Sequence, residues 1–231
     1  MIATRREHPE MGPQKIKAYL GAKIDLSHQS IYEILRDAGL ILPGPKMRRK
    51  FRSFARCHSN SLWQIDIKDL ISGVYLISIM DDHSRLIVAY KITISPTAQV
   101  IIELLGRAIR MFGKPRQILT DHGSQFFSNK GGEATFDQFC RINGITHILA
   151  GVRKPTTIGK VERWHRTLED ELLKFCKDIE EFKERLPGYI EWYNTQRLHW
   201  ALGLRTPLEV YLADFKSLEE FLSPADVHEV P

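Results

Sequence analysis

The chain has 231 residues, of which 43% are hydrophobic and 26% are charged. Both fractions are near those of ordinary globular proteins, which excludes a disordered, collagen-like or coiled-coil chain. No apolar run reaches the roughly 18 residues that a membrane span needs, and the first residues lack the apolar core of a signal peptide. The three cysteines form no CxxC pair, which is typical of a reducing compartment. The composition therefore predicts a soluble cytoplasmic protein with one large domain, or one domain plus a small appendage.

Positive charge is concentrated in one stretch of the chain, although the net charge is only +5. Residues 46–58 contain six lysine or arginine side chains and no acid, whereas residues 209–231 contain six acids and one lysine. Phe51 and Phe54 alternate with the basic side chains, a composition that suits contact with a nucleic-acid backbone. A solvated charged linker would have the same composition, so the stretch alone does not decide between the two.

Residues 1–42 have the pattern of short helices. Pro13 fits the first turn of one helix, and Ser27 is a good N-cap for the next. Leu26 and Ile31 hold the two positions of a hydrophobic staple around that cap. Two such helices are compatible with a helix-turn-helix that reads DNA, and also with a plain helical hairpin. On pattern alone the hairpin is favoured, because the connection between the helices is longer than the tight form of the motif.

From Leu62 onward, the apolar periodicity changes from helical to alternating. Three short strands with tight connections come first, and helices then alternate with strands. This order predicts an α/β fold with a mixed sheet covered by helices. The predicted strands lie within 63–68, 74–80, 85–94, 117–120 and 145–150, and the predicted helices lie at 96–112, around 136–140, and from near 157 past 175.

Three acidic residues lie where acids are structurally awkward. Asp66 is inside a strand, where aspartate is depleted. Asp121 follows a strand at its carboxyl end, a preferred place for active-site groups in open α/β sheets. Glu162 is the only acid in a segment with five basic residues, and on a helix it lies about 100° from Val161. It would therefore face the sheet from the edge of a buried stripe formed by Val161, His165, Leu168, Leu172 and Phe175.

Clustered carboxylates repel one another unless they are protonated or bridged by cations. Hard oxygen ligands of this kind suit Mg²⁺ or Mn²⁺, and two such ions about 3.5–4 Å apart can promote phosphodiester cleavage. Each acid alone also has a structural explanation: Asp66 as a solvent-facing strand residue, Asp121 as a turn former, and Glu162 as the partner of Arg166. Their joint placement favours the metal site.

Other polar and aromatic residues nearby are predicted to be structural. Asp81 and Asp82 come between a strand and a His-Ser pair, as turn residues do. Glu103 is expected on the surface of a helix. Trp164 and Tyr193 are expected in the core rather than stacked on bases.

Four motifs together resemble the catalytic core of insertion-sequence transposases and retroviral-type integrases, the Asp-Asp-Glu (DDE) family. They are WQIDI, TDHGSQF, IGKVERWHRTLE and YNTQRLHWALGLRTP, and the resemblance covers residues 60–212. It implies a ribonuclease-H-like fold, a mixed five-stranded sheet with flanking helices. It also implies divalent-metal-dependent DNA cleavage, followed by transfer of the freed 3′ hydroxyl to a target.

Carried over residue by residue, the resemblance implies that Asp66, Asp121 and Glu162 are the catalytic triad and bind two Mg²⁺ or Mn²⁺ ions. The implied partners are the DNA ends of the element, a target duplex and further copies of the chain in a dimer or larger assembly, without a membrane. The expected location is the cytoplasm, at the nucleoid. The basic side chains around Glu162 are predicted to contact DNA phosphates, with a solvated helix face as the alternative: Lys154, Lys160, Arg163 and Arg166.

The chain also departs from the family pattern. Forty residues separate Asp121 from Glu162, more than is usual, and a surface loop at 128–134 would accommodate the excess cheaply. The loop before Glu162 reads KPTTIGK where the family has a His-Pro-Gln-x-Asn-Gly-Lys pattern. Such transposases usually carry a further helix-turn-helix upstream of this position, so the N-terminal segment is expected to be a truncated form of the family's DNA-binding region. Two alternatives therefore stand beside an active transposase: an inactive DNA-binding remnant and a ribonuclease-H-type nuclease.

The sequence predicts four segments along the chain. The N-terminal segment resembles part of the helix-turn-helix region of such transposases, which strengthens the DNA-reading interpretation of its second helix. The predicted boundaries are 1–42 for this segment, 43–59 for a basic linker, 60–212 for the catalytic core and 213–231 for an acidic tail.

Overall fold

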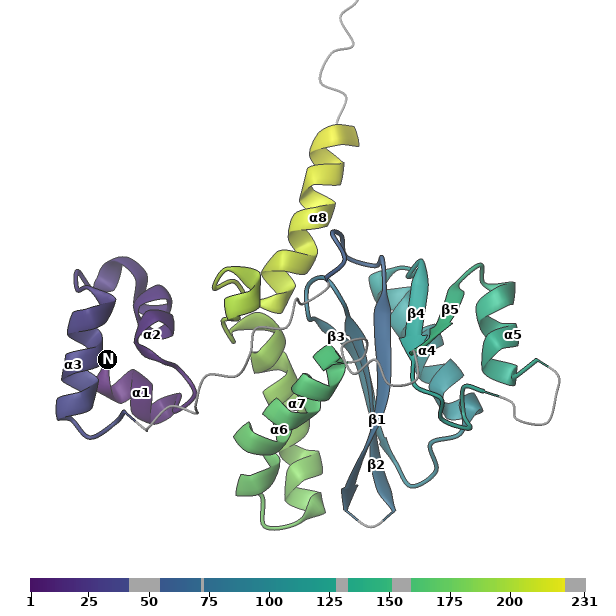
Figure 1. The fold of residues 1–231 in the computed structure, drawn as a ribbon, viewed down its shortest axis with the longest axis horizontal. Helices are drawn as coiled ribbons and strands as arrows, with labels where there is room; N and C mark the ends of the chain where they lie inside the picture. Colours follow the sequence, from purple (N-terminus) through teal and green to yellow (C-terminus); the bar gives the residue numbers. More distant parts are fainter. Residues whose placement is uncertain (42–54, 72, 128–132, 151–158, 223–231) are drawn as a thin grey trace, which may run out of the picture. The chain divides into compact units, whose positions relative to one another are not determined.

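The computed structural model describes residues 1–41, 55–71, 73–127, 133–150 and 159–222 (Figure 1). The chain divides into two compact units, one made of residues 1–52 and 198–205 and the other of residues 53–197 and 206–231. Within the described ranges, no helix combines the length and the apolar character that crossing a lipid bilayer requires.

The smaller unit has a core of its own, built from four buried apolar residues: Met11, Ile16, Ile31 and Leu35. Its N-terminal helices are α1 (Ile2–Glu7), α2 (Pro13–Leu20), the 3-10 turn η1 (Gly21–Lys23) and α3 (His28–Asp37). The predicted N-cap is confirmed, because Ser27 Oγ accepts a hydrogen bond of 3.0 Å from the backbone N–H of Ser30. Helix α1 lies in the range expected to be helical, although the sequence did not predict it as a separate helix. The unit also contains η3 (Trp200–Leu202).

The larger unit is built on a five-stranded sheet in the order β3-β2-β1-β4-β5. Its strands are β1 (Trp63–Ile71), β2 (Val74–Asp81), β3 (Ile87–Thr93), β4 (Gln117–Thr120) and β5 (Thr146–Leu149). The first three strands form an antiparallel meander, whereas β4 pairs in parallel with both β1 and β5. The predicted mixed sheet of five strands is confirmed.

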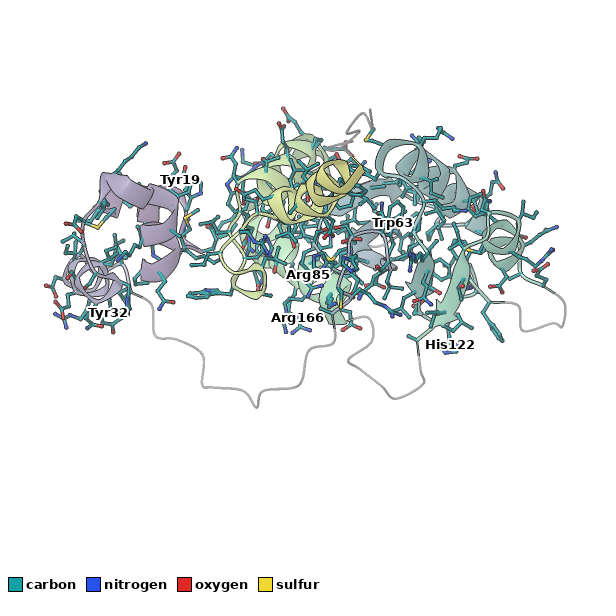
Figure 2. All side chains as sticks on the ribbon, turned by 90° about the horizontal axis from the view of Figure 1, so that it is seen from above. Tyr19, Tyr32, Trp63, Arg85, His122 and Arg166 are labelled. Carbon is teal, nitrogen blue, oxygen red and sulfur yellow. The ribbon has the colours of Figure 1, made fainter. Side chains whose placement is uncertain are left out.

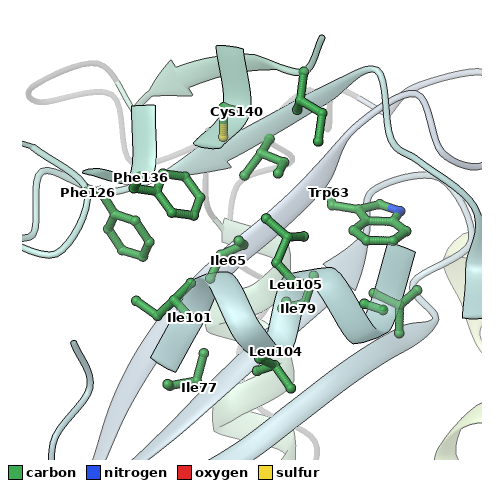
Figure 3. Packing of buried hydrophobic residues seen from close by; sticks show 14 of the residues in the cluster. Trp63, Ile65, Ile77, Ile79, Ile101, Leu104, Leu105, Phe126, Phe136 and Cys140 are labelled. Atoms are coloured by element: carbon green, nitrogen blue, oxygen red, sulfur yellow. The ribbon is translucent and has the colours of Figure 1, made fainter. Parts of the chain in front are cut away.

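Helices cover both faces of this sheet, so the first half of the central strand β1 is buried on both sides (Figure 1). Helices α4 (Ala98–Phe112) and α5 (Thr135–Ile142) pack on one face, and α6 (Gly159–Glu171) and α7 (Ile179–Thr195) pack on the other. Trp63 and Ile65 of β1 point into the first core, together with Ile101 of α4 (Figure 3). The second core joins the opposite face of the sheet to Val161 and Trp164 of α6.

The long helix expected from near residue 157 past Phe175 is shorter than the sequence indicated. Helix α6 ends at Glu171, and a 3-10 turn, η2 (Leu173–Phe175), follows it. Phe175 is 68% exposed, so it is not part of the predicted buried stripe. A new helix begins instead at Asp178, whose side chain accepts a hydrogen bond of 2.9 Å from the backbone N–H of Glu181.

The last helix, α8 (Pro207–Leu222), runs across residue 212, where the sequence analysis placed the end of the core. Its start is fixed by Thr206, whose hydroxyl accepts a hydrogen bond of 3.2 Å from the backbone N–H of Glu209. Tyr211 anchors the helix to the sheet unit, because its ring meets that of Phe112 edge to face at 5.8 Å.

The first core should be the main source of stability of the larger unit. Ile79 of β2 is fully buried in it, so Ile79→Ala should lower the free energy of unfolding by about 2–5 kcal/mol, through reduced burial and the cavity left behind. Urea denaturation followed by tryptophan fluorescence measures this change. The matched control is Ile94→Ala, because Ile94 is 80% exposed and should change stability by no more than about 0.5 kcal/mol. Equal losses in the two variants would contradict the assignment of the core.

Candidate active site

Helix α6 is attached to β1 by polar contacts at three levels. The backbone N–H of Val161 donates to the Gln64 side chain over 3.3 Å. Four residues further along α6 and two further along β1, His165 Nδ1 lies 3.1 Å from Asp66 Oδ2. The third level lies another four residues along α6 and two along β1, and is an ion pair of 3.4 Å between Lys68 and Glu169.

These spacings match because two strand residues advance by about 6.6 Å and four helix residues by about 6 Å. Side chains two apart on a strand share a face, as do side chains four apart on a helix. The contacts therefore form a regular ladder that fixes the position of α6 along β1. Asp66 belongs to the middle rung of this ladder, on the face of β1 opposite Trp63 and Ile65.

Asp121 follows directly after β4, the strand parallel to β1. In this pairing Gln64 is opposite Leu119, and continuing the register by two residues sets Asp66, within β1, beside Asp121, just past the carboxyl end of β4. Asp121 Oδ1 accepts a hydrogen bond of 2.9 Å from the backbone N–H of Gly123, which is the Asx-turn geometry. A Cβ atom at Gly123 would lie 3.0 Å from that carboxylate oxygen, so the glycine of the TDHG motif leaves the acid room.

Asp121 also lines a cavity of about 600 Å³ next to this turn. The loop after Asp121 forms one wall, and the β1–β2 hairpin and the segment between β3 and α4 form the others. The remaining lining residues are Ile67, Asp69, Tyr75, Ile94, Ser95, Pro96, Gly123, Ser124 and Gln125.

Glu162 lies in the first turn of α6, where the positive end of the helix dipole favours a carboxylate. Its side chain is exposed to solvent, so the expectation that it faces the sheet is wrong. Val161, Trp164 and His165 occupy the buried side of α6, so Glu162 lies on the side of the helix that faces solvent.

The three acids therefore come from neighbouring elements but do not form one closed cluster. Among the described residues, no group of three or more histidine, cysteine or carboxylate side chains is arranged so that it could hold a metal ion. The donor chemistry still suits magnesium, because Mg²⁺ is usually held by one or two carboxylates together with waters and substrate phosphates. Asp66, within β1, and Asp121, just past the end of the adjacent strand β4, supply carboxylates of that type.

Lys160 does not lie on a free basic surface. Its ammonium group is 2.5 Å from Asp82 Oδ1 and also donates to the carbonyl oxygen of Asp82 over 3.1 Å. Burial, with the nearby positive charge of Arg85, lowers the pKa of Lys160 to about 8 despite this ion pair. Lys160 therefore ties the start of α6 to the turn after β2.

The other predicted DNA contacts differ in where they lie. Arg163 and Arg166 are both exposed on α6, and Figure 2 shows Arg166 at the edge of the larger unit, whereas Trp63 lies inside it. Their guanidinium groups are accessible to a phosphate backbone. Lys154 and most of the basic stretch at 46–58 lie outside the described residues.

Sequence reasoning missed the two polar residues that organise this site, His165 and Asp82. His165 was assigned to an apolar stripe, and Asp82 to a turn; it is indeed in a turn, but only 1% exposed. Asp82 accepts hydrogen bonds from the backbone of Arg56, the side chain of Gln64 and the ammonium of Lys160. One signal was available in the sequence: the alternation of β1 places Gln64 and Asp66 on the face that α6 covers.

Comparison with known families agrees with this architecture. One family model described as an integrase core domain matches residues 57–155, and a second with the same description matches residues 143–207. The matched ranges include all five strands and helix α6, and therefore Asp66, Asp121 and Glu162.

Among curated proteins, the chain is similar to an uncharacterized 31.7 kDa protein of insertion element IS407 from Burkholderia multivorans, with 27% identity over 79% of this chain and 68% of that protein. It is also similar to the transposase for transposon Tn552 from Staphylococcus aureus, with 31% identity over 76% of this chain. The chain spans only 35% of that transposase.

Among solved structures, the catalytic core domain of HTLV-2 integrase, in complex with magnesium, has the same fold. Its TM-score is 0.52 at 21% identity, over 67% of this chain and 98% of that domain. The ribonuclease-H-like fold expected from the sequence is therefore confirmed. The sheet order, the two family models and the similar proteins lead to one conclusion: the chain belongs to the integrase core domain family.

Proposed function

We propose that the protein is a transposase or integrase that cleaves DNA and joins the freed 3′ end to a target duplex. Asp66, Asp121 and Glu162 act as its catalytic acids. The observation that carries this proposal is the placement of Asp66 within β1 and of Asp121 just past the end of the parallel strand β4, with α6, which carries Glu162, docked on the same strand as Asp66.

The three acids would hold two Mg²⁺ or Mn²⁺ ions. When bound, such ions make the attacking oxygen more nucleophilic and stabilise the leaving oxygen of the phosphodiester. Asp66 supplies a carboxylate held in place from behind by His165. Asp121 and Glu162 are exposed and can turn towards a substrate. Glu162 joins the other two acids as a metal ligand when DNA phosphates occupy the space between the three carboxylates.

Arg163 and Arg166 hold the DNA backbone beside the acids in this proposal. Both lie on the exposed part of α6 next to Glu162, so the phosphate whose bond is broken would lie beside cations that offset its charge. Lys160, already paired with Asp82, positions the start of α6. We propose further that helices α2 and α3 contribute to DNA binding and that the protein works on DNA as a dimer or larger assembly.

Glu162→Gln should abolish metal-dependent DNA nicking. The amide is nearly the same size but carries no charge for a divalent ion, so the rate should fall by more than the roughly 100-fold that removal of an outer-shell partner typically causes. Nicking and joining of supercoiled plasmid in Mg²⁺ and in Mn²⁺ measure the effect without knowledge of the native DNA ends. Asp170→Asn is the matched control, since Asp170 is an exposed acid on the same helix that pairs with Lys174.

Three results would count against this assignment in different ways. Equal nicking by the wild type and Glu162→Gln would show that Glu162 is not the third acid. No nicking by either protein, with duplex binding intact, would favour an inactive DNA-binding protein. Cleavage of RNA–DNA hybrid alone would favour a ribonuclease-H-type nuclease.

Replacing Arg163 and Arg166 together by alanine should weaken DNA binding and flatten its dependence on salt. The slope of log affinity against log salt should become shallower by about 0.9 for each phosphate that the protein no longer neutralises. Fluorescence anisotropy with a labelled duplex at several salt concentrations measures this slope. The double variant Arg107→Ala/Arg110→Ala removes the same charge at the same spacing from exposed positions of α4, on the opposite face of the sheet. A slope that changes equally in both double variants would contradict a specific role for α6.

A further inference from the structure

The Asp66 carboxylate is the last member of a chain of hydrogen bonds beneath α6. Trp164 Nε1 lies 3.1 Å from Ser78 Oγ, and the same oxygen lies 2.9 Å from His165 Nε2. On its other side, His165 Nδ1 lies 3.1 Å from Asp66 Oδ2. Ser78, Trp164 and His165 are at most 4% exposed, so their polar atoms depend on one another rather than on bulk water.

The direction of this chain follows from which atoms can donate. The indole N–H of Trp164 is a donor only, so Ser78 Oγ accepts from it. The hydroxyl proton of Ser78 then has one acceptor within the chain, the lone pair of His165 Nε2. A neutral imidazole that accepts at Nε2 carries its proton on Nδ1. That proton points at Asp66 Oδ2, and an ionised carboxylate can only accept.

Any other arrangement leaves a group unsatisfied. If His165 carried a proton on Nε2, the Ser78 hydroxyl proton would have no acceptor within this series of hydrogen bonds. If Nδ1 were also unprotonated, its lone pair would face the carboxylate of Asp66. An unpaired buried polar group costs about 1–3 kcal/mol, so the arrangement in which each proton has one acceptor is favoured.

We infer that His165 is a positioning residue for Asp66, held by Ser78 and Trp164 as the tautomer that donates from Nδ1, so that Oδ2 is fixed and Oδ1 is left for a metal ion. Among the described residues, Oδ1 of Asp66 accepts no hydrogen bond. The direction of the hydrogen bonds does not depend on the proposed function, whereas the consequence for metal binding rests on it.

This arrangement should strengthen metal binding at Asp66. A carboxylate that can rotate freely must be ordered when it binds an ion, whereas one already fixed through Oδ2 presents Oδ1 in a single orientation. Outer-shell hydrogen bonds of this kind are typically worth about 10–100-fold in metal affinity. His165 thus acts through Asp66 and does not touch the ion or the DNA.

Nitrogen NMR of the histidine side chains tests the direction of these hydrogen bonds in the wild-type protein without metal or DNA. The His165 signals are identified by their disappearance in His165→Asn. We expect Nδ1 to be protonated and Nε2 to be unprotonated and hydrogen-bonded. In Ser78→Ala, which removes the donor to Nε2, the Nε2 resonance should shift. A proton on Nε2 in the wild type, with Nδ1 protonated or not, would overturn the inference.

Mn²⁺ binding, followed by electron paramagnetic resonance of the free ion, tests the consequence without measuring activity. His165→Leu removes the donor and should weaken Mn²⁺ binding by about 10–100-fold. His165→Asn can place an amide N–H near the position of Nδ1 and should restore most of the affinity. Glu169→Gln is the matched control, because it disrupts the neighbouring rung of the ladder and leaves the contact to Asp66 in place.

The possible results separate the two claims. If His165→Leu folds, as judged by circular dichroism, and binds Mn²⁺ like the wild type, the positioning role is wrong. If it does not fold, Ser78→Ala decides, since it should weaken binding less than His165→Leu does but measurably more than Glu169→Gln. If the wild type binds no Mn²⁺, the proposed function and the metal part of the inference both fail, and the NMR result still decides the direction of the chain.

Discussion

Strand β1 is buried on both faces in its first half, and the polar side chains on the face that α6 covers need partners on that helix. Gln64, Asp66 and Lys68 face α6, and all three are matched by groups on that helix. Because an unmatched polar group in such a place is costly, α6 can dock in only one register. The ladder that satisfies β1 therefore also decides where the carboxylate at the start of α6 stands relative to the sheet.

The turn after β2 supports the same arrangement from the other end. Asp82 is almost completely buried, and its carboxylate accepts three hydrogen bonds. They come from the backbone N–H of Arg56 before the sheet, from the side chain of Gln64 in β1, and from the ammonium group of Lys160 at the start of α6. Removing one member of a buried ion pair typically costs about 3–5 kcal/mol. Nearby, Asp81 accepts hydrogen bonds from the backbone of Asn60 and Ser84, and burial raises its pKa.

Much of the fold could be predicted from the sequence, because its signals are local. Strand β4 coincides with the predicted range of 117–120, since a proline and polar residues bound a short apolar run. The end of α6 could not be predicted in this way. Leu168 and Leu172 continue the helical spacing towards Phe175, and only the cap at Asp178 shows that a new helix is about to begin.

The candidate site was predicted less completely, because the contacts that arrange it join distant parts of the chain. The motifs identified the three acids, and whether they act together remains a prediction. Nothing local to Lys160 shows that Asp82, 78 residues away, holds its ammonium group. Likewise, the burial of Trp164 and His165 was predicted, but the position of Glu162 about 100° from Val161 did not reveal that its side chain would be exposed.

The ladder between β1 and α6 has a consequence for how the site is acquired during folding. Its three rungs join residues 97, 99 and 101 positions apart, whereas the β1–β2–β3 meander is made of neighbouring hairpins. Local hairpins close at a lower entropic cost than such long loops. A molecule in which only the meander has formed thus already presents Asp66 on a strand, yet it lacks the histidine that orients this acid and the helix that brings Glu162. The proposed site is therefore assembled only after the chain has completed its most distant contacts, and a partly folded copy lacks it.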